Sequence, residues 1–249
     1  MKKPILFCTC LLISLFTFAQ KTSKPQILLF VHGAWGGGWE YKKIDSLLRT
    51  KGDIPYHPTL TGLGERVHLA NTEINLTTHI NDIVNVFKFE DLHDVILVGH
   101  SYGGMVISGV AEQIPERIKQ LVYLDAFVPE NGESLFMSRG PNGDAMTKPL
   151  TKDGFISYPF GPTKPVPPTD VPQPLKTFTE TLSITNPAVK KIPTSFILMT
   201  KDYNLEKAGF APFAARAKAR GWQIVPLEGG HYAMRDQPAA LLQTLEKCK

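Results

Sequence analysis

Residues 95–106, VILVGHSYGGMV, place a serine with a glycine two positions to either side, between two apolar runs. A serine hydroxyl that stands clear of a strand end to attack a carbonyl needs a sharp strand-to-helix turn, where side chains two positions away would collide. Gly99 and Gly103 remove those side chains. The following helix would direct free amides and its positive dipole end at the reacting oxygen. The pattern predicts Ser101 as a nucleophile and the backbone amide of Tyr102 as an oxyanion donor.

A serine hydroxyl is a weak nucleophile until a base takes its proton, so a histidine is expected near Ser101. The stretch LEGGHYAM, residues 227–234, supplies His231 between the last expected strand and the last expected helix. We predict that His231 is the base. His100 adjoins the serine and is expected to be a packing or hydrogen-bonding neighbour. The histidines show no metal-ligand spacing such as His-Glu-x-x-His, so no metal site is predicted.

A second oxyanion amide is expected in the turn after the first strand. The stretch FVHGAWGGGW, residues 30–39, has the form of such a turn, and Ala34 is the predicted donor. Trp35 is expected either to line a pocket or to lie in the core. Phe127 and Phe136 are candidates for an apolar substrate pocket, with the alternative that they only dock a cap on the sheet.

Apolar runs alternate with helix-like segments along most of the chain, which predicts a mostly parallel sheet with helices on both faces, an α/β fold. Between about residues 129 and 193 the alternation breaks down in a segment rich in proline, and this segment is expected to be a cap insertion over the carboxyl edge of the sheet. The alternative is a mobile linker. The expected strands span 27–31, 95–98, 118–124, 195–199 and 222–227, and the expected helices lie around 44–48, 83–87, 105–111, 210–219 and 239–245.

The amino terminus has the pattern of a secretory signal. Two lysines precede an apolar stretch, and Ala19 marks the expected cleavage point, so residues 1–19 are predicted to be a signal peptide. The apolar stretch is short and interrupted by polar residues, so no stable membrane anchor is predicted. Cleavage would leave Cys248 as the last thiol, without an internal disulfide. Residues 20–249 are expected to form one exported domain, in the periplasm or outside the cell.

The composition favours a small-molecule partner. The chain is 43% hydrophobic, enough for a buried sheet, and its formal charge of +4 comes from scattered basic residues. Scattered charges do not form the basic patch that nucleic-acid binding requires. The composition does not indicate an oligomeric state.

Four motifs together resemble the alpha/beta-hydrolase fold, in particular the branch that contains plant methylesterases, hydroxynitrile lyases and small bacterial esterases. They are His-Gly-Ala-Trp at 32–35, Gly-His-Ser-Tyr-Gly at 99–103, Asp-Ala-Phe-Val-Pro at 125–129 and Gly-Gly-His at 229–231. The resemblance implies a cofactor-free hydrolase that cleaves carboxylic esters through an acyl-enzyme.

The resemblance leaves the acid of the catalytic triad open between two aspartates. Asp202 follows the next-to-last strand and matches the plant methylesterase arrangement. Asp125 follows the strand at 118–124, and the bacterial proteins carry the same Asp-Ala-Phe sequence there and often lack an acid corresponding to Asp202. Either residue satisfies the order serine, aspartate, histidine.

Two other functions remain as alternatives. One is a carbon–carbon lyase like the hydroxynitrile lyases, which typically have threonine and lysine where this chain has Gly33 and Tyr232. The other is a binding protein without catalytic activity, because one fold hosts many functions.

Overall fold

The computed structural model describes residues 24–200 and 210–248. The central sheet of this described part has six strands in the order β2-β1-β3-β4-β8-β9, and all neighbours are parallel. Parallel strands place their carboxyl ends at one edge, where side chains from distant parts of the sequence meet. The strands are β1 (Ile27–Val31), β2 (Ile54–Tyr56), β3 (Val95–His100), β4 (Ile118–Leu124), β8 (Thr194–Met199) and β9 (Gln223–Leu227).

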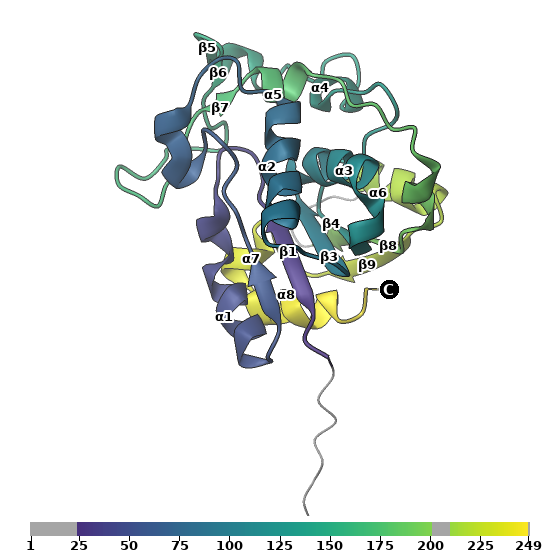
Figure 1. Cartoon of the computed structure of the whole chain (residues 1–249). Helices are drawn as coiled ribbons and strands as arrows, with labels where there is room; N and C mark the ends of the chain where they lie inside the picture. The colour runs from purple at the N-terminus through teal and green to yellow at the C-terminus, as the bar shows by residue number, and fades with distance from the viewer. Residues whose placement is uncertain (1–23, 201–209, 249) are drawn as a thin grey trace, which may run out of the picture.

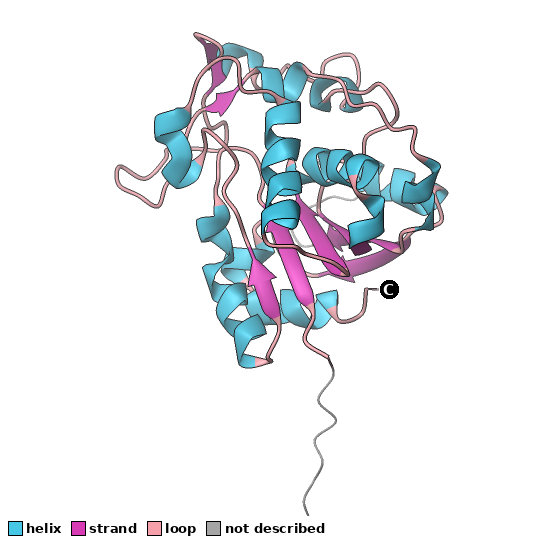
Figure 2. Cartoon of the chain, viewed as in Figure 1, coloured by secondary structure: helices cyan, strands magenta, loops and turns pink. Residues whose placement is uncertain are grey.

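Helices cover both faces of this sheet (Figures 1 and 2). Successive strand residues point to opposite faces, so β1 contributes side chains to two hydrophobic cores, one on each face of the sheet. Leu29 and Val31 pack with α2, α3 and α6, whereas Leu28 and Phe30 pack with α1, α7 and α8. The helices are α1 (Lys42–Thr50), α2 (Leu76–Phe89), α3 (Gly103–Gln113), α6 (Ala211–Ala219), α7 (Ala233–Asp236) and α8 (Pro238–Leu245), and the 3-10 turns are Gly38–Tyr41, Gly64–Leu69, Pro115–Arg117, Lys148–Leu150 and Pro187–Lys191.

Helix α2 shows how local sequence places an element. The Asn75 side chain accepts a hydrogen bond from the Thr78 amide, and the Thr78 hydroxyl accepts one from the Asn75 amide. This reciprocal pair is a capping box at the helix start. The apolar side chains recur three or four positions apart and face the core, as expected for a half-buried helix. They are Leu76, Ile80, Ile83, Val84 and Phe87.

The segment between β4 and β8 lies over the carboxyl edge of the sheet and carries only short elements (Figure 1). Three two-residue strands form a small antiparallel sheet in the order β5-β6-β7. This segment is called the cap below. Its elements are α4 (Leu135–Ser138), β5 (Thr151–Lys152), β6 (Phe155–Ile156), β7 (Gln173–Pro174) and α5 (Lys176–Thr179).

The expected strands of the central sheet and the expected helices are confirmed. One strand of that sheet, β2, was missed, and so were the short helices α4, α5 and α7 and the two-residue strands of the cap. β2 is a three-residue edge strand with Pro55 at its centre, too short and too irregular for a strand pattern. Across the described ranges, no helix combines the length and the apolar character needed to span a bilayer.

Candidate active site

Ser101 occupies a tight turn between β3 and α3, with a positive φ of 54°. A non-glycine residue in this region is strained, and such strain is typical of functional turns. The neighbouring glycines allow the turn. A Cβ on Gly99 would lie 2.7 Å from the Gly103 carbonyl oxygen, and a Cβ on Gly103 would lie 2.5 Å from the carbonyl oxygen of Val31. Only glycine fits at both positions, so the backbone can lift the serine above the strand end.

His231 contacts a buried carboxylate. Its Nδ1 lies 2.7 Å from Oδ2 of Asp125, which is fully buried at the end of β4. The other carboxylate oxygen, Oδ1, accepts a hydrogen bond from the Met199 amide at 3.4 Å. A carboxylate oxygen can only accept, so in the 2.7 Å contact with Oδ2 a neutral His231 carries its proton on Nδ1. Its Nε2 is then free to accept a proton. The rival aspartate, Asp202, lies outside the described residues.

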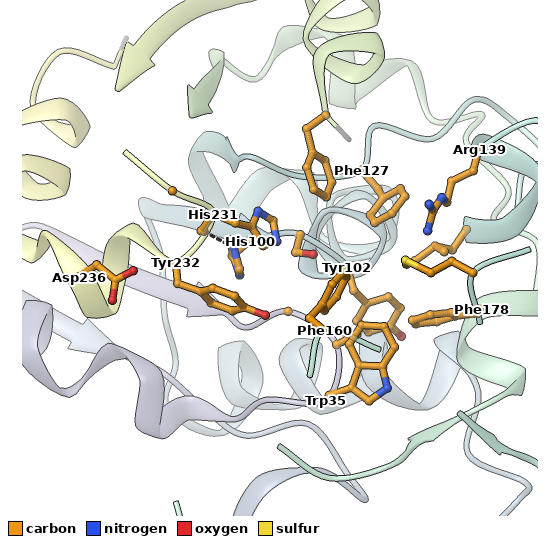
Figure 3. A pocket seen from close by; sticks show the side chains of 17 residues that line it. Trp35, His100, Tyr102, Phe127, Arg139, Phe160, Phe178, His231, Tyr232 and Asp236 are labelled. Atoms are coloured by element: carbon orange, nitrogen blue, oxygen red, sulfur yellow. Dashed lines mark hydrogen bonds between the residues drawn. The ribbon is translucent and has the colours of Figure 1, made fainter. Parts of the chain in front are cut away.

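Ser101 and His231 line one cavity of about 520 Å³ at the carboxyl edge of the sheet (Figure 3). The Phe210 ring stacks on the imidazole, with ring centroids 4.9 Å apart and an interplanar angle of 11°. No hydrogen bond joins Ser101 Oγ to the imidazole within the described part of the chain. Such contacts are often loose without substrate and tighten when it binds.

His100 is the hydrogen-bonding neighbour that the sequence predicted. Its Nε2 lies 2.8 Å from the backbone oxygen of His231, and the two rings are 4.3 Å apart. Burial lowers the pKa of His100 well below its ordinary value, so the ring is neutral and donates through Nε2. His100 therefore holds the backbone of the loop that carries His231.

The turn after β1 is held by a second buried histidine. The Leu60 amide donates to Nε2 of His32 at 3.0 Å, so the ring proton sits on Nδ1 and bonds the Gly33 oxygen at 2.7 Å. Burial lowers the pKa of His32 to about 4, which keeps the ring neutral. In a trans peptide the C=O and N–H point in opposite directions, so His32 turns the Ala34 N–H away from itself.

The two expected oxyanion donors line the cavity together. Ala34 and Tyr102 border it from the turns after β1 and β3. Within residues 24–200 and 210–248, neither backbone N–H has a hydrogen-bond acceptor. Two unpaired amides beside the hydroxyl of Ser101 are the arrangement that stabilises an oxygen anion.

Trp35 joins this turn to the cap. Its amide donates to Oε1 of Gln173 at 3.0 Å, its indole Nε1 donates to the Ile156 oxygen at 2.9 Å, and its own oxygen accepts from the Val171 amide at 2.9 Å. Its φ of 64° lies in the left-handed region, which is unusual for a bulky residue. Trp35 is thus both a cavity wall and the link between turn and cap.

Of the aromatic residues expected in the pocket, Trp35 and Phe127 line the cavity. Phe136 lies outside the lining and packs edge-on against Phe178, with ring centroids 5.5 Å apart, so it supports the wall. The sequence did not predict several other lining side chains, because no motif marks them. They come together only through the folding of the cap and of the segment before α6. They are Leu135, Arg139, Met146, Phe178 and Phe210.

The loop that carries His231 is anchored from behind. The Arg235 guanidinium lies 3.7 Å above the ring of Tyr232 and 3.6 Å from the carboxylate of Glu40. Burial raises the pKa of Glu40 to about 8, although Arg235 opposes the rise. No cluster of three or more histidine, cysteine, aspartate or glutamate side chains suited to a metal ion occurs among the described residues.

A serine on a strand-to-helix turn and a histidine–aspartate pair at the same edge of a parallel sheet define an alpha/beta hydrolase. The chain belongs to the alpha/beta hydrolase family, whose sequence model matches residues 28–244. This family assignment agrees with the resemblance carried by the four motifs.

Individual relatives and solved structures agree with the family. The carbendazim hydrolyzing esterase of Nocardioides sp. (strain SG-4G) is 55% identical over 107 residues, 43% of this chain and 44% of that protein. Salicylic acid-binding protein 2 of Nicotiana tabacum is 31% identical over 106 residues, 41% of this chain and 40% of that protein. The matches thus span less than half the length of these curated relatives. An extracellular alpha/beta-hydrolase from a Paenibacillus species has a TM-score of 0.77 at 24% identity, covering 90% of this chain and 99% of that one.

Proposed function

We propose that this protein is a carboxylic ester hydrolase in which Ser101, His231 and Asp125 form the catalytic triad. The observation that carries the proposal is the 2.7 Å contact between His231 Nδ1 and the buried Asp125 carboxylate, in a cavity that Ser101 also lines. The names of two relatives, the carbendazim hydrolyzing esterase and Methylesterase 1 of Arabidopsis thaliana, support the same reaction class.

In the first half of the reaction, His231 Nε2 takes the proton of Ser101 as Oγ attacks the ester carbonyl carbon. The carbonyl oxygen becomes negative and is bound by the amides of Ala34 and Tyr102. The histidine then gives its proton to the departing alcohol, and the carbon–oxygen bond breaks to leave an acyl-serine. Asp125 holds the imidazole in the correct tautomer and stabilises its charged form throughout.

In the second half, a water molecule replaces the alcohol. His231 takes a proton from the water as its oxygen attacks the acyl carbon, and the same two amides bind the new oxyanion. The histidine returns the proton to Ser101 Oγ, and the carboxylic acid leaves. No cofactor takes part in these steps, because every proton moves between groups that line the cavity.

The substrates that we propose are methyl and other short-alcohol esters of small acids with an apolar carbon chain or ring. Trp35, Phe127 and Phe178 give the cavity apolar walls, and a volume of about 520 Å³ suits a small molecule. Methylesterases recur among the relatives, which supports methyl as the alcohol part. Carbendazim is the second compound to test, because a relative is named for hydrolysing it.

The test is hydrolysis of p-nitrophenyl acetate, butyrate and octanoate, then of methyl esters and carbendazim, by the purified chain. Ser101→Ala should remove nearly all turnover, whereas Ser46→Ala, an exposed serine on α1, should leave it unchanged. A fluorophosphonate should add to the Ser101 peptide alone, as mass spectrometry would show. Wild-type turnover by Ser101→Ala would refute the mechanism.

Two results would direct the assignment elsewhere. Release of an aldehyde and cyanide from a cyanohydrin, without ester cleavage, would identify a lyase. Tight binding of a carboxylic acid such as salicylate, without turnover of any ester, would identify a binding protein.

We also propose that the protein is exported. Residues 1–20 lie outside the described part, so the support is their sequence pattern together with the word extracellular in the name of the Paenibacillus structure. Amino-terminal sequencing of the protein recovered from the culture medium or periplasm should begin after Ala19. Recovery of the uncleaved chain from the cytoplasm would contradict this prediction.

A further inference from the structure

One cation lines the otherwise apolar end of the cavity. Arg139 follows α4 in the cap, and its side chain points into the cavity (Figure 3). The residue remains exposed, yet desolvation by the side chains around it lowers the pKa of its guanidinium. The lining of the cavity also includes Leu135 and Met146, which carry no charge.

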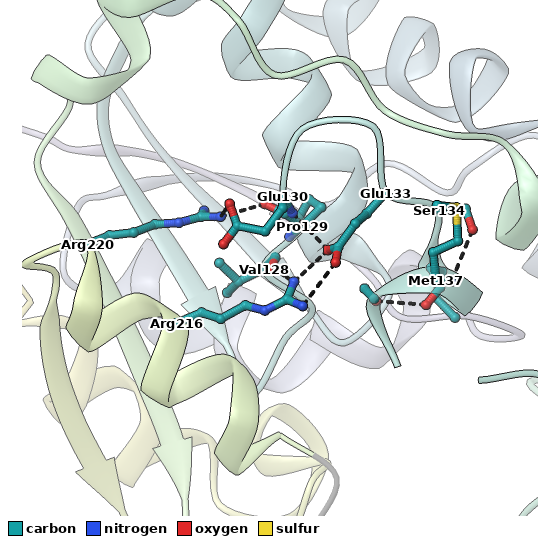
Figure 4. Close-up of polar contacts among 10 residues, drawn as sticks. Val128, Pro129, Glu130, Glu133, Ser134, Met137, Arg216 and Arg220 are labelled. Atoms are coloured by element: carbon teal, nitrogen blue, oxygen red, sulfur yellow. Dashed lines mark hydrogen bonds and ion pairs between the residues drawn. The ribbon is translucent and has the colours of Figure 1, made fainter. Parts of the chain in front are cut away.

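Arg139 differs from the other arginines of the chain. Each of the other six forms an ion pair with an aspartate or glutamate, whereas the Arg139 side chain has no ion pair or hydrogen bond among the described residues. Figure 4 shows two paired ones, Arg216 and Arg220, bound to Glu133 and Glu130 of the cap. The unpaired guanidinium of Arg139, beside the apolar side chains of a cavity, is free to bind an anion that enters it.

Among the described residues, the cavity lining holds one acid, and it lies on the side away from Arg139. Asp236 borders the opposite end, with His231 and Tyr232 between it and Arg139 (Figure 3). The acid therefore cannot pair with the arginine across the site.

We propose that Arg139 binds an anionic group of the substrate, a carboxylate at the end remote from the reacting ester. The inference rests on the proposed function and names a substrate class for it, the monoesters of dicarboxylic acids. A guanidinium presents parallel N–H donors that match a carboxylate, and such charge-assisted pairs are strong where water is partly excluded. The apolar walls would hold the chain that separates the two ends of the molecule.

The preference is measured with matched pairs of substrates. One member is the monomethyl ester of a linear dicarboxylic acid of four to eight carbons, and the other is the same ester with its free carboxylate replaced by an amide. The pairs have nearly equal size and differ in charge. We expect kcat/KM for the anion to exceed that for the amide by about tenfold or more at one chain length at least, the usual range for a charge-assisted contact.

The variants separate a specific contact from a general electrostatic effect. Arg139→Met should bring the anion-to-amide ratio close to one, and Arg139→Lys should restore part of it. Lys148→Met removes an exposed cation of the same cap that does not line the cavity, so it should leave the ratio unchanged. Equal turnover of both members at every chain length, or an equal loss in Lys148→Met, would overturn the proposal.

A binding measurement distinguishes failure of this inference from failure of the proposed function. Calorimetry with monomethyl adipate compares Ser101→Ala with the double variant that also carries Arg139→Met, and needs no turnover. If the wild type hydrolyses no ester, but monomethyl adipate binds Ser101→Ala and not the double variant, the hydrolase is refuted and the anion site is supported. Ester turnover without anion preference would refute the anion site alone.

Discussion

Replacement of Asp125 by asparagine tests how the triad is assembled. In the native protein, Oδ1 accepts the Met199 amide and Oδ2 faces Nδ1 of His231. An asparagine keeps the first contact only if its carbonyl oxygen takes the Oδ1 position, which places its NH₂ against His231. A donor there forces Nδ1 to accept, so the ring proton moves to Nε2. The histidine can then no longer take the proton of Ser101.

The expected loss follows from this reversal. The charge-assisted hydrogen bond at 2.7 Å contributes about 1.5–3 kcal/mol, and the wrong tautomer adds to its loss. Together they amount to about 5.5 kcal/mol, a fall of about 10⁴ in kcat, as is typical for this substitution in serine hydrolases. KM should change little, because Asp125 is fully buried and does not line the cavity.

The assay is steady-state hydrolysis of p-nitrophenyl butyrate near pH 7.5, with nitrogen NMR to identify the His231 tautomer. Thermal unfolding checks that Asp125→Asn remains folded. Asp202→Asn is the matched control and should retain most of the activity. A variant at Asp125 with more than a tenth of wild-type kcat, together with a loss of a hundredfold or more at Asp202, would refute the reasoning.

Three further perturbations test the surroundings of the site. Gly103→Ala places a Cβ 2.5 Å from the Val31 backbone oxygen, so we expect a loss of about 2 kcal/mol or more in unfolding free energy, measured with denaturant, and unchanged stability would contradict it. Burial lowers the pKa of His79 to about 4 in the folded protein, so as the pH falls the unfolded chain binds a proton at this residue before the folded chain does. The unfolding free energy of the wild type should therefore fall between pH 6.5 and 4, by up to about 1.4 kcal/mol per pH unit from this residue. His79→Gln should show a shallower fall in denaturant unfolding across that range, and an equal slope would contradict the assignment. Gln173→Leu removes the acceptor of the Trp35 amide and should lower kcat by about tenfold with a smaller effect on KM for p-nitrophenyl butyrate, whereas an unchanged kcat would show that the turn holds its shape alone.

The central sheet could be predicted because its buried strands are long apolar runs. Val95–His100 and Ile118–Leu124 are buried on both faces, and such strands are nearly continuous in Val, Ile and Leu. β2 has three residues at a sheet edge, and the cap strands have two each, so none is long enough to repeat the two-residue alternation that marks a strand. These elements exist through tertiary contacts, which no local pattern encodes.

The placement of Ser101 and His231 in one site could be predicted because local geometry constrains their neighbours. Ser101 needs glycines at fixed offsets, and that need is visible in sequence. The acid has no such signature. Asp125 directly follows β4 and Asp202 comes shortly after β8, which are adjacent parallel strands, so both were compatible with a histidine after β9. Only coordinates show that the carboxylate of Asp125 reaches the imidazole.

The cap carries more of the chemistry than its irregular sequence indicates. Trp35 directly follows the oxyanion donor Ala34, and its amide, indole and carbonyl groups each bond a cap residue. A shift of the cap would therefore rotate the peptide next to that donor, and a shift of a fraction of an ångström weakens an oxyanion contact. Arg139 comes from the same segment, so the element that would recognise the substrate also holds the turn that would stabilise the transition state. Changes in the cap that alter specificity must therefore keep Gln173 and its contact to Trp35, or lose rate as they gain a new substrate.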